Sequence, residues 1–296
     1  MAGSRFAAGR FALELDGTMS GFLKSVEGGA IAADVIVEPA GSGFPKKHIG
    51  QPRYEELALR LDLSLEKAVY QWIADSWAGK APRHDGSIVA VSSQGKAVSE
   101  REFVRAFLSE VTVSAADAAS KEPGFLTVKL QPETLRTKKG SGEPAKAAVA
   151  AKAKAWLPAN FKLEIDGLDC KKVSKIDALT FRQKLTEGSV RERRVRTKEP
   201  TSMETPNLRI TFAESSSQTW TAWFDDFVVK GNSGDENEKS GKLSFLAPDL
   251  KSVLAEISFF NLGIFRLEPE PQAVDAQAIA RIRADLYCER IELTVP

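Results

Sequence analysis

The sequence predicts a mainly β protein with two tandem antiparallel β-sandwich or barrel domains, each with one packed α-helix. Three observations support this fold class. Most predicted elements alternate apolar and polar residues, short turns join consecutive strands, and one strand motif occurs twice. We expect the first domain at residues 1–135, a linker rich in alanine, lysine and glycine at 136–157, and the second domain at 158–296.

The repeated motif opens each half of the chain. Phe11–Gly17 reads FALELDG, and Phe161–Gly167, 150 positions later, reads FKLEIDG. In both copies apolar residues alternate with polar or small ones, which is the pattern of a strand with one buried face. Both copies end in Asp-Gly, a dipeptide suited to a tight hairpin turn. We interpret the motif as the trace of an internal duplication.

In the first half, strand-like sequence continues over residues 22–37. The segment Glu38–Arg53 contains three glycines and two prolines, a density that predicts a loop and excludes a helix or a central strand. Leu57–Leu63 alternates as a half-buried strand does. Ser64 is then a predicted N-cap. The helix after it has an apolar face with spacing i, i+3, i+4, i+7 and i+8: Leu65, Ala68, Val69, Trp72 and Ile73.

The first half ends with more strands. Residues 88–91 and 98–113 predict a hairpin around a turn at 92–96. A second reading stays open, because Ser99 and Glu102 have the spacing of a capping box that begins a short helix. A last strand is expected at 125–130, and the linker follows it.

The second half repeats this order. Strands are expected at 161–167, 176–185, 208–212, 243–246, 253–267 and 279–295. A longer loop, Thr186–Asn207, replaces the glycine- and proline-rich loop. Tryptophan and phenylalanine then take up helical spacing, and Trp223 lies 151 positions after Trp72. A helix packed on a sheet explains these tryptophans better than a ligand box does.

This order of elements resembles the tail-tube family of contractile phage tails and related bacterial injection machines. The residues that carry the resemblance are the F-x-L-E-[LI]-D-G strand, the loop ending near His48-Ile49-Gly50, the strand and helix over Leu57–Trp72 and Leu208–Trp223, and the closing patterns Phe125–Glu133 and Ala280–Val295. The resemblance covers both halves apart from the linker and residues 231–241. It implies a structural, ring-forming conduit or an adaptor between tube and hub, and not an enzyme.

The resemblance also implies partners. Tube proteins of this family form six-fold rings, so the chain is expected to associate with itself, either as a homotrimer with a pseudo-six-fold ring or as a homohexamer. Tube, sheath and baseplate or spike proteins are the other expected partners. Assembly is expected in the bacterial cytoplasm, followed by a place in a virion tail or an injection particle. The alternative is a monomeric two-domain β-sandwich that binds a ligand such as a carbohydrate.

Composition argues against several other partners. The chain has 41 Lys plus Arg and 40 Asp plus Glu, so no overall field attracts nucleic acid or an anionic membrane. No apolar run approaches the ~18 residues of a membrane span, so no membrane anchor is expected. The two cysteines, Cys170 and Cys288, lie far apart without a CxxC motif, which favours a reduced compartment and no disulfide.

The sequence predicts no catalytic, cofactor or metal site. Two carboxylate pairs, Glu14 with Asp16 and Glu164 with Asp166, have the residue type for acid–base chemistry, but we interpret both pairs as solvent-facing. The two histidines, His48 and His84, lie in predicted loops without metal-ligand spacing.

The candidate site is therefore an interface. Phe44, Pro45 and His48 in the first loop are predicted to contact other subunits. So are four arginines in the second loop: Arg191, Arg193, Arg194 and Arg196. No aromatic residue lies between these arginines to stack on bases, so we expect a subunit contact or a solvated loop rather than nucleic acid binding.

Overall fold

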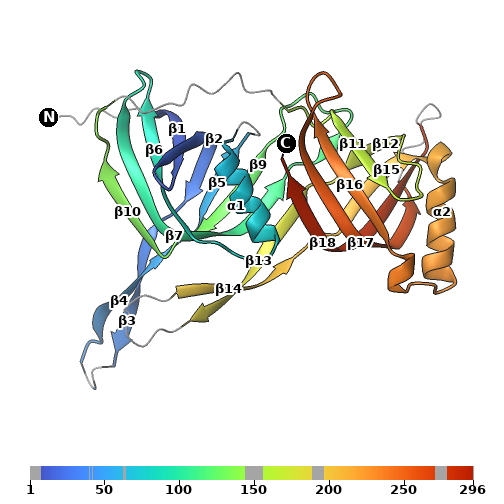
Figure 1. Cartoon of the computed structure of the whole chain (residues 1–296). Coiled ribbons are helices and arrows are strands. Elements are labelled where there is room, and N and C mark those ends of the chain that lie inside the picture. The colour runs from blue at the N-terminus through green and yellow to red at the C-terminus, as the bar shows by residue number, and fades with distance from the viewer. Residues whose placement is uncertain are drawn as a thin grey trace.

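The computed structural model describes residues 8–39, 41, 43–62, 65–143, 156–188, 197–270 and 279–295. Two barrel-like sheets lie side by side (Figure 1), and the pairings between the described strands are antiparallel. The predicted mainly β fold class is confirmed.

The first sheet forms a closed barrel. Its strands pair in the order β7 (Ala97–Val113), β6 (His84–Ser92), β1 (Ala8–Leu15), β2 (Thr18–Gly28), β5 (Leu57–Leu61) and β9 (Leu126–Gln131). Strand β9 pairs with β7 again and closes the circle. A further strand, β10 (Thr134–Lys139), also pairs with β7.

The second sheet has the same kind of order but stays open. Its strands run β11 (Phe161–Ile165), β16 (Lys239–Leu246), β17 (Val253–Pro269), β18 (Arg281–Thr294), β15 (Leu208–Ala213) and β12 (Val173–Ile176), and end at β8 (Ala116–Asp117). Within the described residues β11 does not pair with β12. Strand β8 belongs to the first half of the sequence, so the halves share this sheet.

The two Asp-Gly motifs behave differently. Asp16 and Gly17 have φ values of 49° and 79° and join β1 to β2 in the predicted hairpin. In the second copy the Leu168 amide donates to the Ile165 carbonyl at 3.0 Å, but no hairpin follows, so that prediction is wrong. The chain is held toward the second helix instead, because the Trp220 indole donates to the Asp169 carbonyl at 3.1 Å.

Both predicted helices are present. Helix α1 (Lys67–Trp77) buries Trp72 and Ile73, and its N-cap is Glu66; the predicted cap, Ser64, lies outside the described residues. Helix α2 (Gln218–Phe224) continues as a π-helical turn over Asp225–Val229. All five tryptophans are buried, which confirms that they belong to the core.

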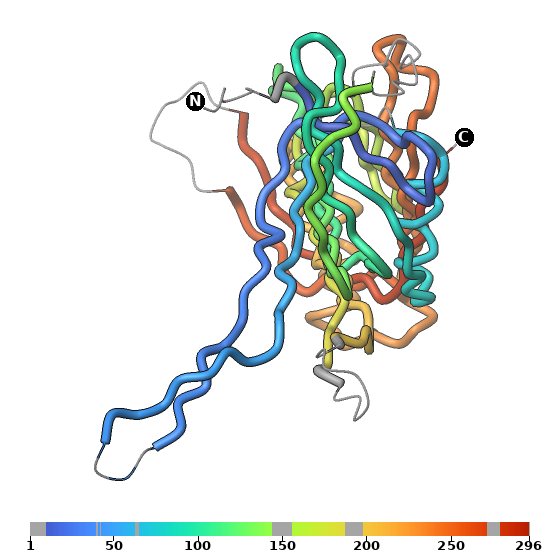
Figure 2. The backbone as a smooth tube through the Cα atoms, turned by 90° about the vertical axis from the view of Figure 1, so that its left-hand side faces the viewer, coloured from blue at the N-terminus to red at the C-terminus, as the bar shows by residue number. Residues whose placement is uncertain are grey.

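The glycine- and proline-rich segment is mostly strand, not loop. Strands β3 (Ile31–Glu38) and β4 (Lys46–Tyr54) form a separate two-stranded sheet, which projects from the first barrel (Figures 1 and 2). We call it the ribbon. The breakers exclude a central strand, as predicted, but an edge strand tolerates proline because its outer N–H positions need no partner. Pro52 lies opposite Ala33, beside a β-bulge.

The second half holds an equivalent hairpin in a different place. Strand β13 (Leu179–Gly188) pairs with β14 (Thr197–Glu204), so the predicted loop Thr186–Asn207 is partly strand. The strand predicted at 176–185 is divided between β12 and β13. Strand β13 pairs with β7 and so joins the first sheet (Figure 1).

Two further expectations concern the middle of the chain. Ser99 and Glu102 lie within β7, so the hairpin reading holds and the capping-box reading is wrong. Residues 136–139 of the predicted linker belong to β10, and residues 144–155 lie outside the described part. The division into two domains at these boundaries stays a prediction. No helix in the described ranges is long and apolar enough to cross a membrane.

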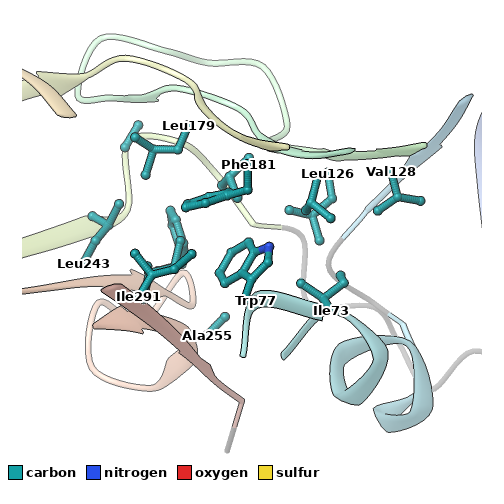
Figure 3. Close-up of a cluster of buried hydrophobic side chains, with 14 of the residues drawn as sticks. Ile73, Trp77, Leu126, Val128, Leu179, Phe181, Leu243, Ala255 and Ile291 are labelled. Atoms are coloured by element: carbon teal, nitrogen blue, oxygen red, sulfur yellow. The ribbon is translucent and has the colours of Figure 1, made fainter. Parts of the chain in front are cut away.

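The hydrophobic core continues from one half into the other. Figure 3 shows Ile73 and Trp77 of α1 among side chains of both sheets. Leu126 and Val128 come from β9, Leu179 and Phe181 from β13, and Leu243, Ala255 and Ile291 from the second sheet. Helix α1 also packs against β18.

Candidate inter-subunit surfaces

The ribbon carries apolar side chains in solvent. Val35, Val37 and Ile49 are 62%, 53% and 80% exposed, and Phe44 at the tip is 98% exposed. A protruding pair of strands cannot bury both of its faces against its own barrel. An exposed apolar patch of this kind is typical of surfaces that contact another molecule.

Two of the predicted contact residues, Phe44 and Pro45, lie at the ribbon tip between β3 and β4, and the third is in β4. His48 Nε2 lies 3.3 Å from Glu38 Oε2 across the ribbon. Farther from the tip, Arg53 pairs with Asp34 at 2.9 Å. These exposed ion pairs contribute about 0–1 kcal/mol each, so they stabilise the ribbon only weakly.

The other extended surface is the junction between the two halves, where β7 pairs with β13. Val111 lies opposite Phe181, and Thr112 lies opposite Thr180 with their hydroxyl oxygens 3.0 Å apart. Phe181 is 1% exposed and packs on Trp77, with ring centroids 4.2 Å apart. Backbone pairing and aromatic packing therefore act together at this junction.

An ion pair crosses the same strands. Arg182 Nε donates to Glu110 Oε2 at 2.9 Å, and Lys129 Nζ lies 2.9 Å from Glu110 Oε1. Burial raises the pKa of the Glu110 carboxyl, but the hydrogen bonds from Lys129 and Arg182 outweigh burial, and the pKa lies below its ordinary value of 4.5. Glu110 is therefore charged when the junction is intact.

A second ionic cluster holds the β13–β14 hairpin against the first barrel. Arg83 pairs with Glu133 at 3.2 Å and with Glu199 of β14 at 2.8 Å. Its side chain is only 13% exposed and lies over the Phe107 ring, 5.0 Å from the centroid. Lys198 Nζ donates to the amide oxygen of the buried Gln131 at 2.8 Å.

Three of the four paired carboxylates, Glu14, Asp16 and Glu164, take part in ion pairs or hydrogen bonds with neighbouring side chains. Asp16 accepts a 2.6 Å contact from His84 Nδ1, and Glu14 accepts from the Ser87 hydroxyl at 3.4 Å. Lys162 lies 2.8 Å from Glu164, and this hydrogen bond lowers the pKa of the Glu164 carboxyl. No group of three metal-ligating side chains occurs among the residues described.

The four predicted contact arginines, Arg191, Arg193, Arg194 and Arg196, lie outside the described residues. Cys170 and Cys288 are both free thiols. The exposed aromatic groove that a carbohydrate-binding module needs cannot use the tryptophans, because all five are buried.

Sequence reasoning missed the junction. The strand predicted at 176–185 includes Leu179 and Phe181, but no local pattern indicates the strand with which it pairs. Arg83, Glu110 and Arg182 were not singled out either. A charged residue beside an apolar strand is usually solvated, and only the fold brings these charges together.

Two features stand out among the described surfaces: the β7–β13 junction, which adds strands of the second half to the first sheet, and the apolar ribbon that extends into solvent. Residues 7–136 match the family model described as T4-like virus tail tube protein gp19. The match covers less than half of the chain, and over that part the protein is similar to the tail-tube family. A comparison with curated proteins finds no match.

Solved structures give the same kind of likeness. The sheath–tube complex of the extracellular contractile injection system PVC is 19% identical with a TM-score of 0.42, covering 47% of this chain and 94% of that chain. The tube terminating cap of the anti-feeding prophage is 20% identical with a TM-score of 0.42, covering 47% and 94%. Hcp1 from Flavobacterium johnsoniae is 16% identical with a TM-score of 0.28, covering 44% and 96%. These TM-scores are too low to extend the likeness beyond the family match.

Proposed function

We propose that three copies of this chain form a hollow ring of six barrels, which acts as a tube segment or as an adaptor between tube and hub in a contractile tail or injection particle. The β7–β13 junction carries the proposal. It joins the two halves as lateral neighbours by adding β13 and β14 of the second half to the sheet of the first half, and lateral neighbours are what a ring requires. Stacked halves, as in a six-chain assembly two layers deep, would not share a sheet edge in this way.

The second half is proposed as a second tail-tube domain. Its strands repeat the pairing of the first half. Leu23 of β2 lies opposite Leu61 of β5, and Val173 of β12, 150 positions after Leu23, lies opposite Phe212 of β15. A β-bulge follows Leu23 and Val173 in both strands. A shared bulge at the same register supports duplication more strongly than composition does, because a bulge is a specific backbone feature.

The ribbon serves as the proposed contact between rings or with a neighbouring tube protein. Phe44 and Pro45 lie at its tip, His48 lies in β4 close to the tip, and the ribbon projects away from the rest of the chain (Figure 2). The ring's role is mechanical, as a rigid passage, and it involves no catalysis. The particle is assembled in the bacterial cytoplasm, with tube, sheath and baseplate or spike proteins as the further partners.

Native mass spectrometry and negative-stain electron microscopy of the purified protein test this proposal together. We expect a three-chain mass and hollow particles with six lobes. A six-chain mass would contradict the stoichiometry. A single-chain species that persists at high concentration would contradict ring formation itself.

A further inference from the structure

The junction inside the chain has a counterpart at the chain's outer edges. Strand β17 repeats β7 at an offset of 156 residues: Arg105 and Asn261 both have positive φ, 50° and 56°. Val111 of β7 pairs with Val128 of β9, and at the same offset Leu267 of β17 pairs with Ala284 of β18. Glu110–Val113, which pair with β13, therefore correspond to Arg266–Pro269.

Strand β17 has a free edge at these positions. It pairs with β16 only as far as Leu262, and from Gly263 to Pro269 its described pairings are with β18 alone. In β7 the equivalent edge is covered by β13. A free strand edge presents unpaired N–H and C=O groups that another strand can satisfy.

Strand β3 repeats β13 at an offset of 150 residues. Both strands have a β-bulge at the same point, between Ala33 and Val35 and between Gln183 and Leu185. Phe181 therefore corresponds to Ile31. Strand β3 pairs with β4 on one edge, and no described strand pairs with its other edge, where β13 has β7.

Positions that the inner junction buries are exposed at these two edges. Phe181 and Trp77 are 1% and 6% exposed, whereas Ile31 is 53% exposed. The helices of the two halves are offset by 151 residues, as Trp72 and Trp223 are, so Trp77 corresponds to Val228. Val228 is 41% exposed. Phe265, beside the free edge of β17, is 45% exposed. Each edge thus holds half of an apolar cluster that is complete only inside the chain.

We infer that the β17 edge of one copy pairs antiparallel with the β3 edge of the next, in the register of the β7–β13 junction, so that Leu267 lies opposite Ile31. This inference rests on the proposed ring and identifies the surface that closes it. The contact is heterologous, because the two edges are different surfaces, and such contacts form closed rings when the rotation allows. Burial of Ile31, Val228 and Phe265 supplies its apolar core.

Disulfide trapping tests the register. In the Ile31→Cys/Leu267→Cys variant, the proposed register puts the cysteine at 267 of one copy directly opposite the cysteine at 31 of the next. Residues directly opposite have Cβ atoms ~5 Å apart, close to the reach of a disulfide. Mild oxidation should link chains into two- and three-chain species on a non-reducing gel. Val35→Cys/Leu267→Cys is the matched control, because Val35 lies about 13 Å farther along β3. Linking in the control and not in the test variant would overturn the register.

Charge substitution tests the edges separately. Ile31→Asp and Leu267→Asp should each reduce assembly at least tenfold, with unchanged far-UV circular dichroism. Mixing the two variants should restore two-chain complexes, because each variant keeps one intact edge. Leu250→Asp, at a turn residue that is 60% exposed, should assemble normally. Intact rings in both edge variants would overturn this inference and leave the ring standing, whereas a parent protein that never assembles would overturn both.

Discussion

Trp77 at the end of α1 and Phe181 in β13 pack with their ring centroids 4.2 Å apart and their planes at 38°. One residue comes from each half of the sequence, and both are buried. Their contact lies where β13 pairs with β7, so aromatic packing and backbone pairing stabilise the same junction. Aromatic pairs of this kind contribute about 0.5–1.5 kcal/mol beyond their buried area.

Replacing Phe181 should therefore destabilise the whole chain. Phe181→Ala leaves a cavity beside Trp77, and we expect the free energy of unfolding to fall by about 3–5 kcal/mol. Urea unfolding monitored by tryptophan fluorescence measures this change. Phe44→Ala is the control, because Phe44 is 98% exposed and its loss should change stability by less than about 0.5 kcal/mol. Equal effects of the two substitutions would contradict the packing role of Phe181.

The junction should weaken in acid through Glu110. The pKa of this carboxyl is lowered in the folded state, so its contribution is fully present above the ordinary value of 4.5 and is lost as the pH falls through the lowered pKa. Glu110→Gln should cost roughly 1–2 kcal/mol at pH 7, and the difference from the parent should shrink below pH ~4. Urea unfolding at both pH values measures this difference.

Glu164→Gln is the matched control for that experiment. The pKa of the Glu164 carboxyl is also lowered, through its hydrogen bond with Lys162, but its side chain is 44% exposed and solvent screens the pair. Its substitution should therefore have the smaller effect at pH 7. A pH-independent cost for Glu110→Gln would show that shape, not charge, matters at this position.

The sequence predicted what depends on local patterns. The alternation of Leu57, Leu59 and Leu61 gave a strand that is buried on one face, and the spacing of Trp72 and Ile73 gave α1. The Asp16-Gly17 hairpin also formed, because turn chemistry is local. Strand partners are not local. Nothing near Phe181 indicates that its strand pairs with β7 rather than with its own half.

The ribbon shows why glycine and proline were misread. Breakers exclude a central strand because every N–H there must be paired, but an edge strand needs only half of its backbone groups. The candidate interface stays a prediction. Phe44 is exposed at the ribbon tip, and whether it contacts another subunit stays a prediction, while the charged cluster around Arg83 required the fold to be seen.

Arg83 should control how firmly the β13–β14 hairpin is held. Arg83→Met removes the guanidinium that pairs with both Glu133 and Glu199. The Glu133 side chain is only 16% exposed, so water compensates poorly for this loss. We expect a loss of about 1–3 kcal/mol and faster hydrogen exchange in β14 than in β5. Arg53→Met, which breaks an exposed pair with Asp34, should cost at most about 1 kcal/mol. Unchanged exchange in β14 would contradict the role of Arg83.

The two thiols should be inert in the folded protein. Burial raises the pKa of Cys170 and that of Cys288 to about 11 each, so at pH 8 only ~1 in 1,000 of either is the reactive thiolate. A chromogenic disulfide reagent should label neither within minutes, and should label both quickly in denaturant. Ser93→Cys, in an exposed turn, should react at once in the folded protein. Rapid labelling of either cysteine in the folded parent would mean that the structure around that cysteine opens readily.

The ribbon should matter for stacking and not for folding. Ile49 is 80% exposed and lies in β4 near Phe44, so Phe44→Ser/Ile49→Ser should leave the unfolding curve within about 0.5 kcal/mol of the parent. If the ribbon connects rings, single rings should persist while stacked rings become at least tenfold rarer in electron micrographs. Val229→Ser, a substitution of another exposed apolar residue away from the ribbon, is the control and should leave stacking unchanged. Normal stacking in the double variant would assign the ribbon's apolar surface to a different partner.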